Sequence, residues 1–566
     1  MLIPSISLAQ QGQSHTSPHE MHPLAAKTWR SDHPIDSKIV MAPDSILDYS
    51  IAMPFHPKPI SGVFQPLNVI ANNFGILSPN ETASRGVAVD MDFIDTLDPT
   101  QAHALEFALP EGGSIQIWLT RSEQTLPNQI VWYGKIAGVA NSSVIMALDG
   151  PSMRMIVRNL NSNGRTFGVR GTPVGHMLYE HVNLSVDCQP QPAMLSHHDD
   201  AGSAGSADGA RIRGNQPPAQ VDPNRLDIMI VYTDEARAAF GSESAVNANS
   251  AALIADLNLR LSNSGVPFSA AYIPVRWTII AGYTQPPLAV SDDLSVILTD
   301  LSVLNGQADF NGVVSSDSIT DSIQNTRDQY RPDFVHMITH NTNGSGIGWK
   351  PGSLESMTST GTGYAVSRSD VALDGGTFGH EVGHNLGGCH NANASRPSCN
   401  QGVNDTDRGI EGYCDVPDDI CGGCEDIEYR TTMAYAVASD LFGRATRVEA
   451  YSVTGLTASL SGSFGSCSVN LWASDARVAD TINLSRQWAS QYNLVSTQYW
   501  VATDGIFDEF GLFEIPGRSV QAGLDRVNGG VLNGVVRVKA GTYTSGPQVW
   551  SGNAKINTFG GAAVFR

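Results

Sequence analysis

Charged side chains are scarce in this sequence, and basic ones are the scarcest. Only 16% of the 566 residues are charged, and 34 Lys and Arg face 55 Asp and Glu, giving a net charge of −21. Nucleic acids and anionic membrane surfaces are bound through basic patches, so this balance argues against both as standing partners. No apolar run reaches the ~18 residues of a membrane span. No repeat of about 20–50 residues occurs, which argues against solenoid and propeller folds.

The chain is too long for one ordinary domain, so we expect two to four compact units. Its first residues, up to Gln11, lack a basic start and a full apolar stretch. Ser7-Leu8-Ala9 before Gln10 nevertheless resembles the small-residue end of a signal peptide. A plain irregular N-terminus is the alternative. We expect a secreted protein, extracellular or periplasmic.

Seven cysteines support export. Cys188 stands alone, and the other six fall between Cys389 and Cys467. An even cluster of this kind suits a disulfide framework, although the sequence does not choose among its pairings. Cys421 and Cys424 could instead form a redox or zinc pair. No second pair with this spacing lies beside them, so disulfides are favoured.

Four regions differ in pattern. From about residue 103 to 182, short apolar runs separated by turn residues predict a small antiparallel β unit. Residues 196–223 are rich in Ser, Gly, Ala, Asp and Pro and predict an exposed linker. Beyond it, strand patterns alternate with helix patterns, which indicates an α/β layer fold. Residues 534–543 resemble the opening coil of parallel β-helix proteins, so we expect a small β-helix-like module near the C-terminus.

The α/β region is defined by five segments with clear periodicity. Buried-strand and helix patterns follow one another, and the last helix closes the region. The expected strands are 226–233, 275–280 and 333–338, and the expected helices are 245–264 and 475–492.

One motif in the α/β region carries chemistry. His380 and His384 are four residues apart, so on a helix both imidazoles project from one face and can bind one metal ion. Glu381 lies beside them, where a carboxylate can accept a proton from an attacking water. Gly387 can end the helix in a left-handed conformation, and the reversal would bring His390 round as a third ligand. Three imidazoles leave a coordination position open, as catalysis requires.

A methionine downstream extends the motif. The sequence HEVGHNLGGCH followed by TTMAY at 431–435 resembles the metzincin clan of zinc peptidases. The closest likeness is to bacterial reprolysin-like, adamalysin-related enzymes and the peptidyl-Asp metalloendopeptidase group. Residues 226–241, 327–330 and 346–349 fit the same likeness, which covers roughly 224–492.

The resemblance implies a fold and a set of roles. The fold would be α/β (α+β), with a mixed twisted sheet and an active-site helix. His380, His384 and His390 would hold Zn²⁺, Glu381 would be the general base, and Met433 would form a hydrophobic floor. Tyr435 would be a fifth ligand, an oxyanion stabiliser or a packing residue. Residues 363–369 would form the edge strand that pairs with substrate.

Three features leave alternatives open. Asn391 stands where adamalysin-type enzymes usually have Asp, which bears on the subfamily and not on zinc binding. The acidic, cysteine-rich stretch 391–430 could bind Ca²⁺ or be a solvated loop. Cys188 could block the zinc as a cysteine switch or be a free thiol.

We therefore expect a monomeric zinc endopeptidase acting on protein or peptide substrates, made as a zymogen. A secreted adhesive or matrix-binding protein with a relic peptidase domain is the alternative, and the presence of Glu381 argues against it. A zinc hydrolase of non-peptide substrates is a third reading. The expected segments are a signal-peptide remnant at 1–9, a propeptide-like region at 10–195, a linker with a processing site at 196–223, the catalytic domain at 224–492 and the C-terminal module at 496–566.

Overall fold

The structure is a computed structural model in which two compact units are Met1–Ile35 and Asp36–Arg566. All described residues belong to the second unit. The described residues are 59–70, 81–126, 129–139, 142–159, 165–182, 225–267, 269–272, 278–280, 293–302, 315, 320, 323, 327, 332–340, 342, 344–351, 363–390, 408–409, 411–417, 424–434, 446–455, 457–462, 465–471, 477–489, 498–501, 535–543 and 555–565.

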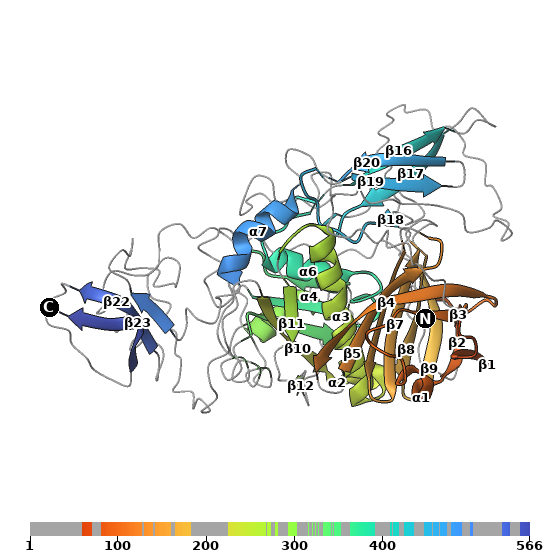
Figure 1. Ribbon diagram of the computed structural model, residues 1–566, viewed down its shortest axis with the longest axis horizontal. Helices are drawn as coiled ribbons and strands as arrows, with labels where there is room; N and C mark the ends of the chain where they lie inside the picture. Colours follow the sequence, from red (N-terminus) through yellow and green to blue (C-terminus); the bar gives the residue numbers. More distant parts are fainter. Residues whose placement is uncertain are drawn as a thin grey trace, which may run out of the picture. The chain divides into compact units, whose positions relative to one another are not determined.

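Nine antiparallel strands form the first part, called the N-terminal sheet below (Figure 1). It begins at Phe64 and not near residue 103 as predicted, because Pro66 and Asn68 obscure the alternation in the first strand. Pro66 is tolerated there because this strand lies at the sheet edge. A short helix, α1 (Met91–Ile94), precedes the third strand. The strands, in sheet order, are β1 (Phe64–Ile70), β2 (Glu81–Val89), β9 (Gly175–Val182), β8 (Arg165–Thr172), β7 (Ser152–Asn159), β6 (Ser142–Asp149), β5 (Gln129–Ile136), β4 (Ser114–Leu126) and β3 (His103–Ala108).

The middle strands of the N-terminal sheet are buried on both faces. In β6, Val144 and Met146 join a cluster that also holds residues of β3, β4 and β8. Ile145 and Ala147 point the other way, into a cluster shared with the α/β region. Because successive side chains of a strand alternate between faces, this double burial explains the nearly continuous apolar run of β6.

The second part is an α/β region built on a six-stranded sheet, called the central sheet below (Figure 1). Its strands pair in parallel except β14, which is antiparallel to β15. Its strands are β10 (Arg225–Thr233), β11 (Ser269–Tyr272), β12 (Thr278–Ile280), β13 (Phe334–Thr339), β14 (Gly346–Gly348) and β15 (Tyr364–Arg368), and the helices around it are α2 (Asp234–Phe240), α3 (Glu243–Asn263), α4 (Asp293–Ser302), α6 (Thr377–Asn385) and α7 (Val478–Ala489).

The order of the central sheet is β11-β10-β13-β15-β14, with β12 also paired to β10. The prediction that residues 363–369 form the edge strand is wrong, because β15 pairs with β13 on one side and β14 on the other. The edge of this sheet next to α6 is β14. This strand is not predictable from the sequence, because three residues, two of them glycine, carry no alternating pattern.

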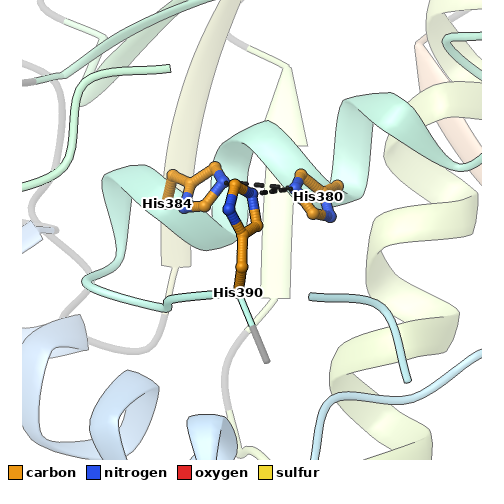
Figure 2. Close-up of side chains that lie close together, drawn as sticks. All are labelled: His380, His384 and His390. Carbon is orange, nitrogen blue, oxygen red and sulfur yellow. Dashed lines mark hydrogen bonds between the residues drawn. The ribbon is translucent and has the colours of Figure 1, made fainter. Parts of the chain in front are cut away.

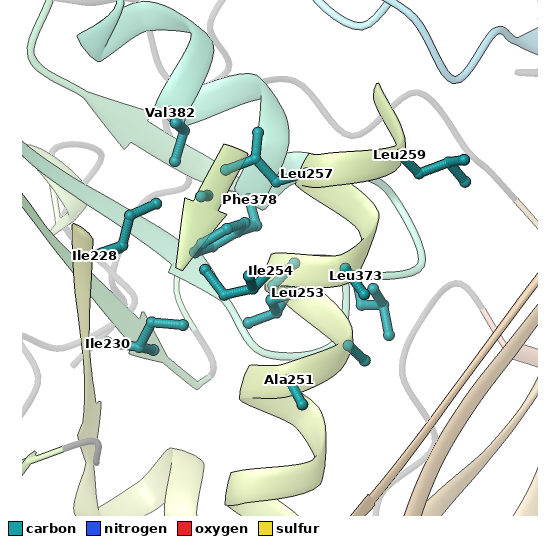
Figure 3. Packing of buried hydrophobic residues seen from close by; sticks show 14 of the residues in the cluster. Ile228, Ile230, Ala251, Leu253, Ile254, Leu257, Leu259, Leu373, Phe378 and Val382 are labelled. Atoms are coloured by element: carbon teal, nitrogen blue, oxygen red, sulfur yellow. The ribbon is translucent and has the colours of Figure 1, made fainter. Parts of the chain in front are cut away.

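Both faces of β10 are covered by helices. Ile228 and Ile230 pack with residues of α3 and α6 (Figure 3). Met229 and Val231 face the opposite way and pack with α4. Such a strand reads as a continuous apolar run because neither face meets water.

The helix α3 connects the two parts. Ser242 caps its first turn by accepting a hydrogen bond from the Ala245 amide at 3.1 Å. Most of its residues are buried, and its side chains join the cluster that includes Val131 and Ile156 of the N-terminal sheet. The N-terminal sheet and the α/β region therefore share one hydrophobic core through α3.

The remaining strands lie in three small sheets. The strands β21, β22 and β23 pair in parallel in chain order, and the β-helix predicted for this part stays a prediction. Within the described residues, no helix is long and apolar enough to cross a membrane. These strands are β16 (Glu411–Pro417), β17 (Cys424–Arg430), β18 (Thr446–Arg447), β19 (Thr457–Gly462), β20 (Gly465–Asn470), β21 (Gln498–Val501), β22 (Val535–Tyr543) and β23 (Lys555–Phe565).

Candidate metal centre

The helix α6 presents the first two histidines and then reverses. Gly387 has a φ of 93°, a conformation that favours glycine. The Gly387 amide donates to the His384 carbonyl at 2.8 Å, and the Gly388 amide donates to the Gly383 carbonyl at 2.8 Å. These two bonds make a Schellman ending, which satisfies carbonyls that the helix itself cannot. The reversal predicted from Gly387 is present, and His390 follows it.

The three histidine rings converge. His380 and His384 come from α6 and His390 from the segment after the turn (Figure 2). The Nε2 atom of His380 lies 3.1 Å from the Nε2 atoms of both His384 and His390. The Nε2 atoms of His384 and His390 are 2.9 Å apart. All three side chains are buried. Within the residues that the structure describes, this is the one cluster of metal-ligating side chains.

Two backbone carbonyls determine which ring nitrogens carry protons. His380 Nδ1 lies 2.7 Å from the Thr432 carbonyl, and His384 Nδ1 lies 2.8 Å from the Gly388 carbonyl. A carbonyl only accepts, so each Nδ1 must be the donor and each neutral ring leaves a bare lone pair on Nε2. The close Nε2 contacts of Figure 2 then hold two lone pairs face to face and no proton between them.

A cation bound between the three Nε2 atoms would remove the repulsion between their lone pairs. The three imidazoles therefore fit a metal ion. Three imidazole nitrogens at about 2.0–2.1 Å from one tetrahedral ion would lie about 3.3 Å apart, close to the separations found here. Burial lowers the pKa of His384 to about 3, and so favours the neutral ring that a metal ligand requires. Hydrogen bonds from the far nitrogen to carbonyls are the usual means of orienting such ligands.

Met433 packs directly beneath α6. It is fully buried, and a Cβ placed on Gly383 would lie 2.4 Å from its sulfur. The turn around it is closed by the Ala434 amide, which donates to the Thr431 carbonyl at 3.0 Å. Tyr451 approaches the same face of α6, and its hydroxyl donates to the Gly379 carbonyl at 2.6 Å. The glycines of α6 therefore allow this close approach, which explains why a helix carries them.

Glu381 lies between the histidines and the edge strand. Its side chain is fully buried on α6. A Cβ on Gly346 would come within 2.6 Å of its Oε1, and one on Gly348 within 3.3 Å of its Oε2. The two glycines of β14 thus make room for the carboxylate. Asn385 ties the end of α6 to the sheet, because its Nδ2 donates to the carbonyls of Trp349 and Tyr364.

Two other predicted site residues, Tyr435 and Cys188, lie outside the described residues, so their roles stay predictions. Cys389, next to His390, is disulfide-bonded, and the wider six-cysteine framework also stays a prediction. Thr432 lies beside Met433, and nothing in the sequence marks it as a functional residue. For Arg260, the sequence signal is its spacing of four residues from Asp256 inside an apolar helix.

Comparisons with known proteins add one match to this geometry. Residues 222–451 match a reprolysin family described as metallo-peptidase family M12. No curated protein matches the chain. Among solved structures, one described as "Structure of a chaperone-substrate complex" aligns at 16% identity and a TM-score of 0.29. That alignment covers 63% of this chain and 44% of the other, and the likeness is too weak to carry an argument.

Proposed function

We infer that this chain is a reprolysin-like zinc metalloendopeptidase, because residues 222–451 match metallo-peptidase family M12. In this enzyme, His380, His384 and His390 would hold the zinc ion, and Glu381 would be the general base. The observation that carries the assignment is the convergence of three Nε2 atoms whose rings are oriented by carbonyls. A zinc ion held there supplies Lewis acidity toward the scissile carbonyl and the attacking water.

The chain's own residues perform the proton transfers. Glu381 follows His380 on α6, so its carboxylate accepts the proton of the attacking water and returns it to the leaving amine. Packing of the carboxylate against the glycines of β14 fixes its position. Met433 supports the helix from below.

We assign the substrate strand to β14. It ends the central sheet beside α6, and Glu381 packs against its glycines. An extended peptide that paired with this edge would bring a backbone carbonyl close to the histidines. The substrate class is protein or peptide, as befits an endopeptidase.

Export and zymogen activation are part of the proposal. The disulfide of Cys389 supports an oxidising compartment, where such bonds persist. Activation would follow a cut within 196–223, with Cys188 withdrawn from the zinc. Calcium binding in 391–430 remains a prediction.

The test compares wild type with Glu381→Ala on an unstructured protein substrate, with and without a chelator. Activity should fall by about 10²–10⁴-fold in the variant while its zinc content stays unchanged. Glu123→Ala, on the exposed side of the N-terminal sheet, is the matched carboxylate control and should keep full activity. Equal cleavage by Glu381→Ala would reject the assignment, and mass spectrometry of the enzyme itself would show whether 196–223 is cut.

A further inference from the structure

Two arginines of the N-terminal sheet reach into the α/β region. Both lie on β7, and their side chains are only 2% and 5% exposed. Arg154 donates to the Asp374 carboxylate at 2.8 Å. Arg158 donates to the carboxylates of Asp256 and Glu449, and its other terminal nitrogen donates to the Leu373 carbonyl at 2.8 Å. Because ions buried this deeply lose their hydration, removing one partner leaves the other charge uncompensated.

The contacts of Arg158 continue to a zinc ligand. Asp256, on α3, also accepts from Nε of Arg260 at 2.9 Å. Arg260 in turn donates to the Thr432 hydroxyl at 3.1 Å. The carbonyl of that threonine accepts the Nδ1 proton of His380 at 2.7 Å. Each link is a direct contact between buried groups, so β7 is joined to the metal centre through α3 and the turn that holds Met433.

A second route reaches the start of α6. Gly376, the residue before that helix, has a φ of 68°, and a Cβ there would lie 2.6 Å from the Arg260 guanidinium. Asp374, which Arg154 binds, lies two residues earlier, and Leu373 accepts from Arg158. The segment that leads into the zinc-binding helix is therefore held from the N-terminal sheet.

The charges and the apolar surface both argue against separation of the two parts. In this network the N-terminal sheet contributes the guanidiniums of Arg154 and Arg158, and the α/β region contributes three carboxylates and Arg260. Without the sheet, Asp374 and Glu449 would lose the guanidiniums that they bind, and Asp256 would keep only Arg260. The α3 face that now packs on β5, β6 and β7 would also become exposed.

We propose that Arg158 is a positioning residue for the zinc ligand His380, and that the N-terminal sheet consequently remains bound to residues 224–492 in the active enzyme, even after a cut within 196–223. The inference rests on the proposed function, because it takes His380 as a zinc ligand. On this proposal, activation cuts the chain within 196–223 but does not release the N-terminal sheet. The sheet remains as a structural part of the active enzyme.

The first test cuts the chain without removing anything. A recognition sequence for a site-specific protease is inserted between Gly205 and Ser206 of the full-length protein, and the cut protein is passed over a size-exclusion column. The two pieces should elute together with zinc and separate only in denaturant. Separation in native buffer, with zinc and activity retained by the C-terminal piece, would overturn the proposal.

The second test measures zinc affinity by competition with a chelator, and the visible absorption of the cobalt-substituted protein. Arg158→Ala should bind zinc more weakly and change the cobalt spectrum, with a loss no larger than the about 10–100-fold that removing a direct partner of a metal ligand generally costs. Arg158→Lys should lie between it and wild type, and kcat should fall more than KM rises. Arg121→Ala, an exposed arginine of the same sheet, is the control and should match wild type.

Thr432→Val covers the case in which Arg158→Ala does not fold, because it removes only the hydroxyl at the other end of the path. It should weaken zinc binding in the same direction. Wild-type zinc affinity in both Arg158→Lys and Thr432→Val would refute the positioning role. Elution and zinc affinity are also measured in the Glu381→Ala background, so they decide the inference even if the chain proves to cleave no peptide.

Discussion

The buried imidazole of His336 should make this protein sensitive to acid. His336 lies on β13, only 1% exposed, with Nε2 2.9 Å from the Ser367 hydroxyl and its ring packed on Phe378 of α6 at 4.4 Å between centroids. Burial lowers its pKa to about 3 from the usual 6.5. The unfolded chain therefore binds a proton near pH 6.5 while the folded chain does not, so stability is lost as the pH falls below 6.5.

The magnitude follows from the two pKa values. Each pH unit below 6.5 removes about 1.4 kcal/mol from the free energy of unfolding, so His336 alone removes about 2 kcal/mol between pH 7 and pH 5. The assay is urea unfolding of zinc-saturated protein at both pH values. In His336→Gln the loss should shrink by that amount, because no proton can be taken up at this position.

Ser367→Ala is the matched control. It removes the hydrogen-bond partner of His336 and leaves the burial of the ring, which is the cause of the lowered pKa, in place. Its pH dependence should therefore equal that of wild type. An unchanged pH dependence in His336→Gln would show that the buried ring is not what couples stability to acid.

Two further substitutions test the packing around α6. Gly383→Ala would place a Cβ 2.4 Å from the sulfur of Met433. We expect the free energy of unfolding in urea to fall by about 1–3 kcal/mol, and zinc to bind more weakly in competition with a chelator. Unchanged zinc binding would mean that Met433 does not support the ligands. Gly346→Ala would place a Cβ on β14 against Oε1 of Glu381, so kcat should fall while the zinc content stays unchanged. A normal kcat would mean that the general base is another carboxylate.

Much of the site could be predicted from local sequence because it depends on local geometry. The spacing of His380 and His384 puts both rings on one helix face, and the glycine at 387 permits the reversal that brings His390 back. The same holds for β10 and β13, whose apolar runs are long enough to be recognised, whereas β11 was not predicted. The edge strand β14 escaped because three residues, two of them glycine, have no periodicity.

The extent of the N-terminal sheet was harder to predict, and its role harder still. Its first two strands carry weak alternation, and their pairing partners lie far along the chain, as in β2 with β9. The arginines of β7 look like ordinary strand residues in the sequence. They become meaningful only when α3 lies against that strand and brings carboxylates to them.

Local sequence was enough to single out the three imidazoles proposed to hold zinc, the neighbouring carboxylate and the turn that joins them, because all lie within eleven residues whose geometry is helical and then reversed. What holds them in place depends on contacts between distant segments. The carbonyl of Thr432, the guanidinium of Arg260 and the buried arginines of β7 reach the site from segments far apart in the chain, and packing of the N-terminal sheet on α3 brings them together. Contacts of that kind depend on burial and charge pairing between segments, which no local spacing records.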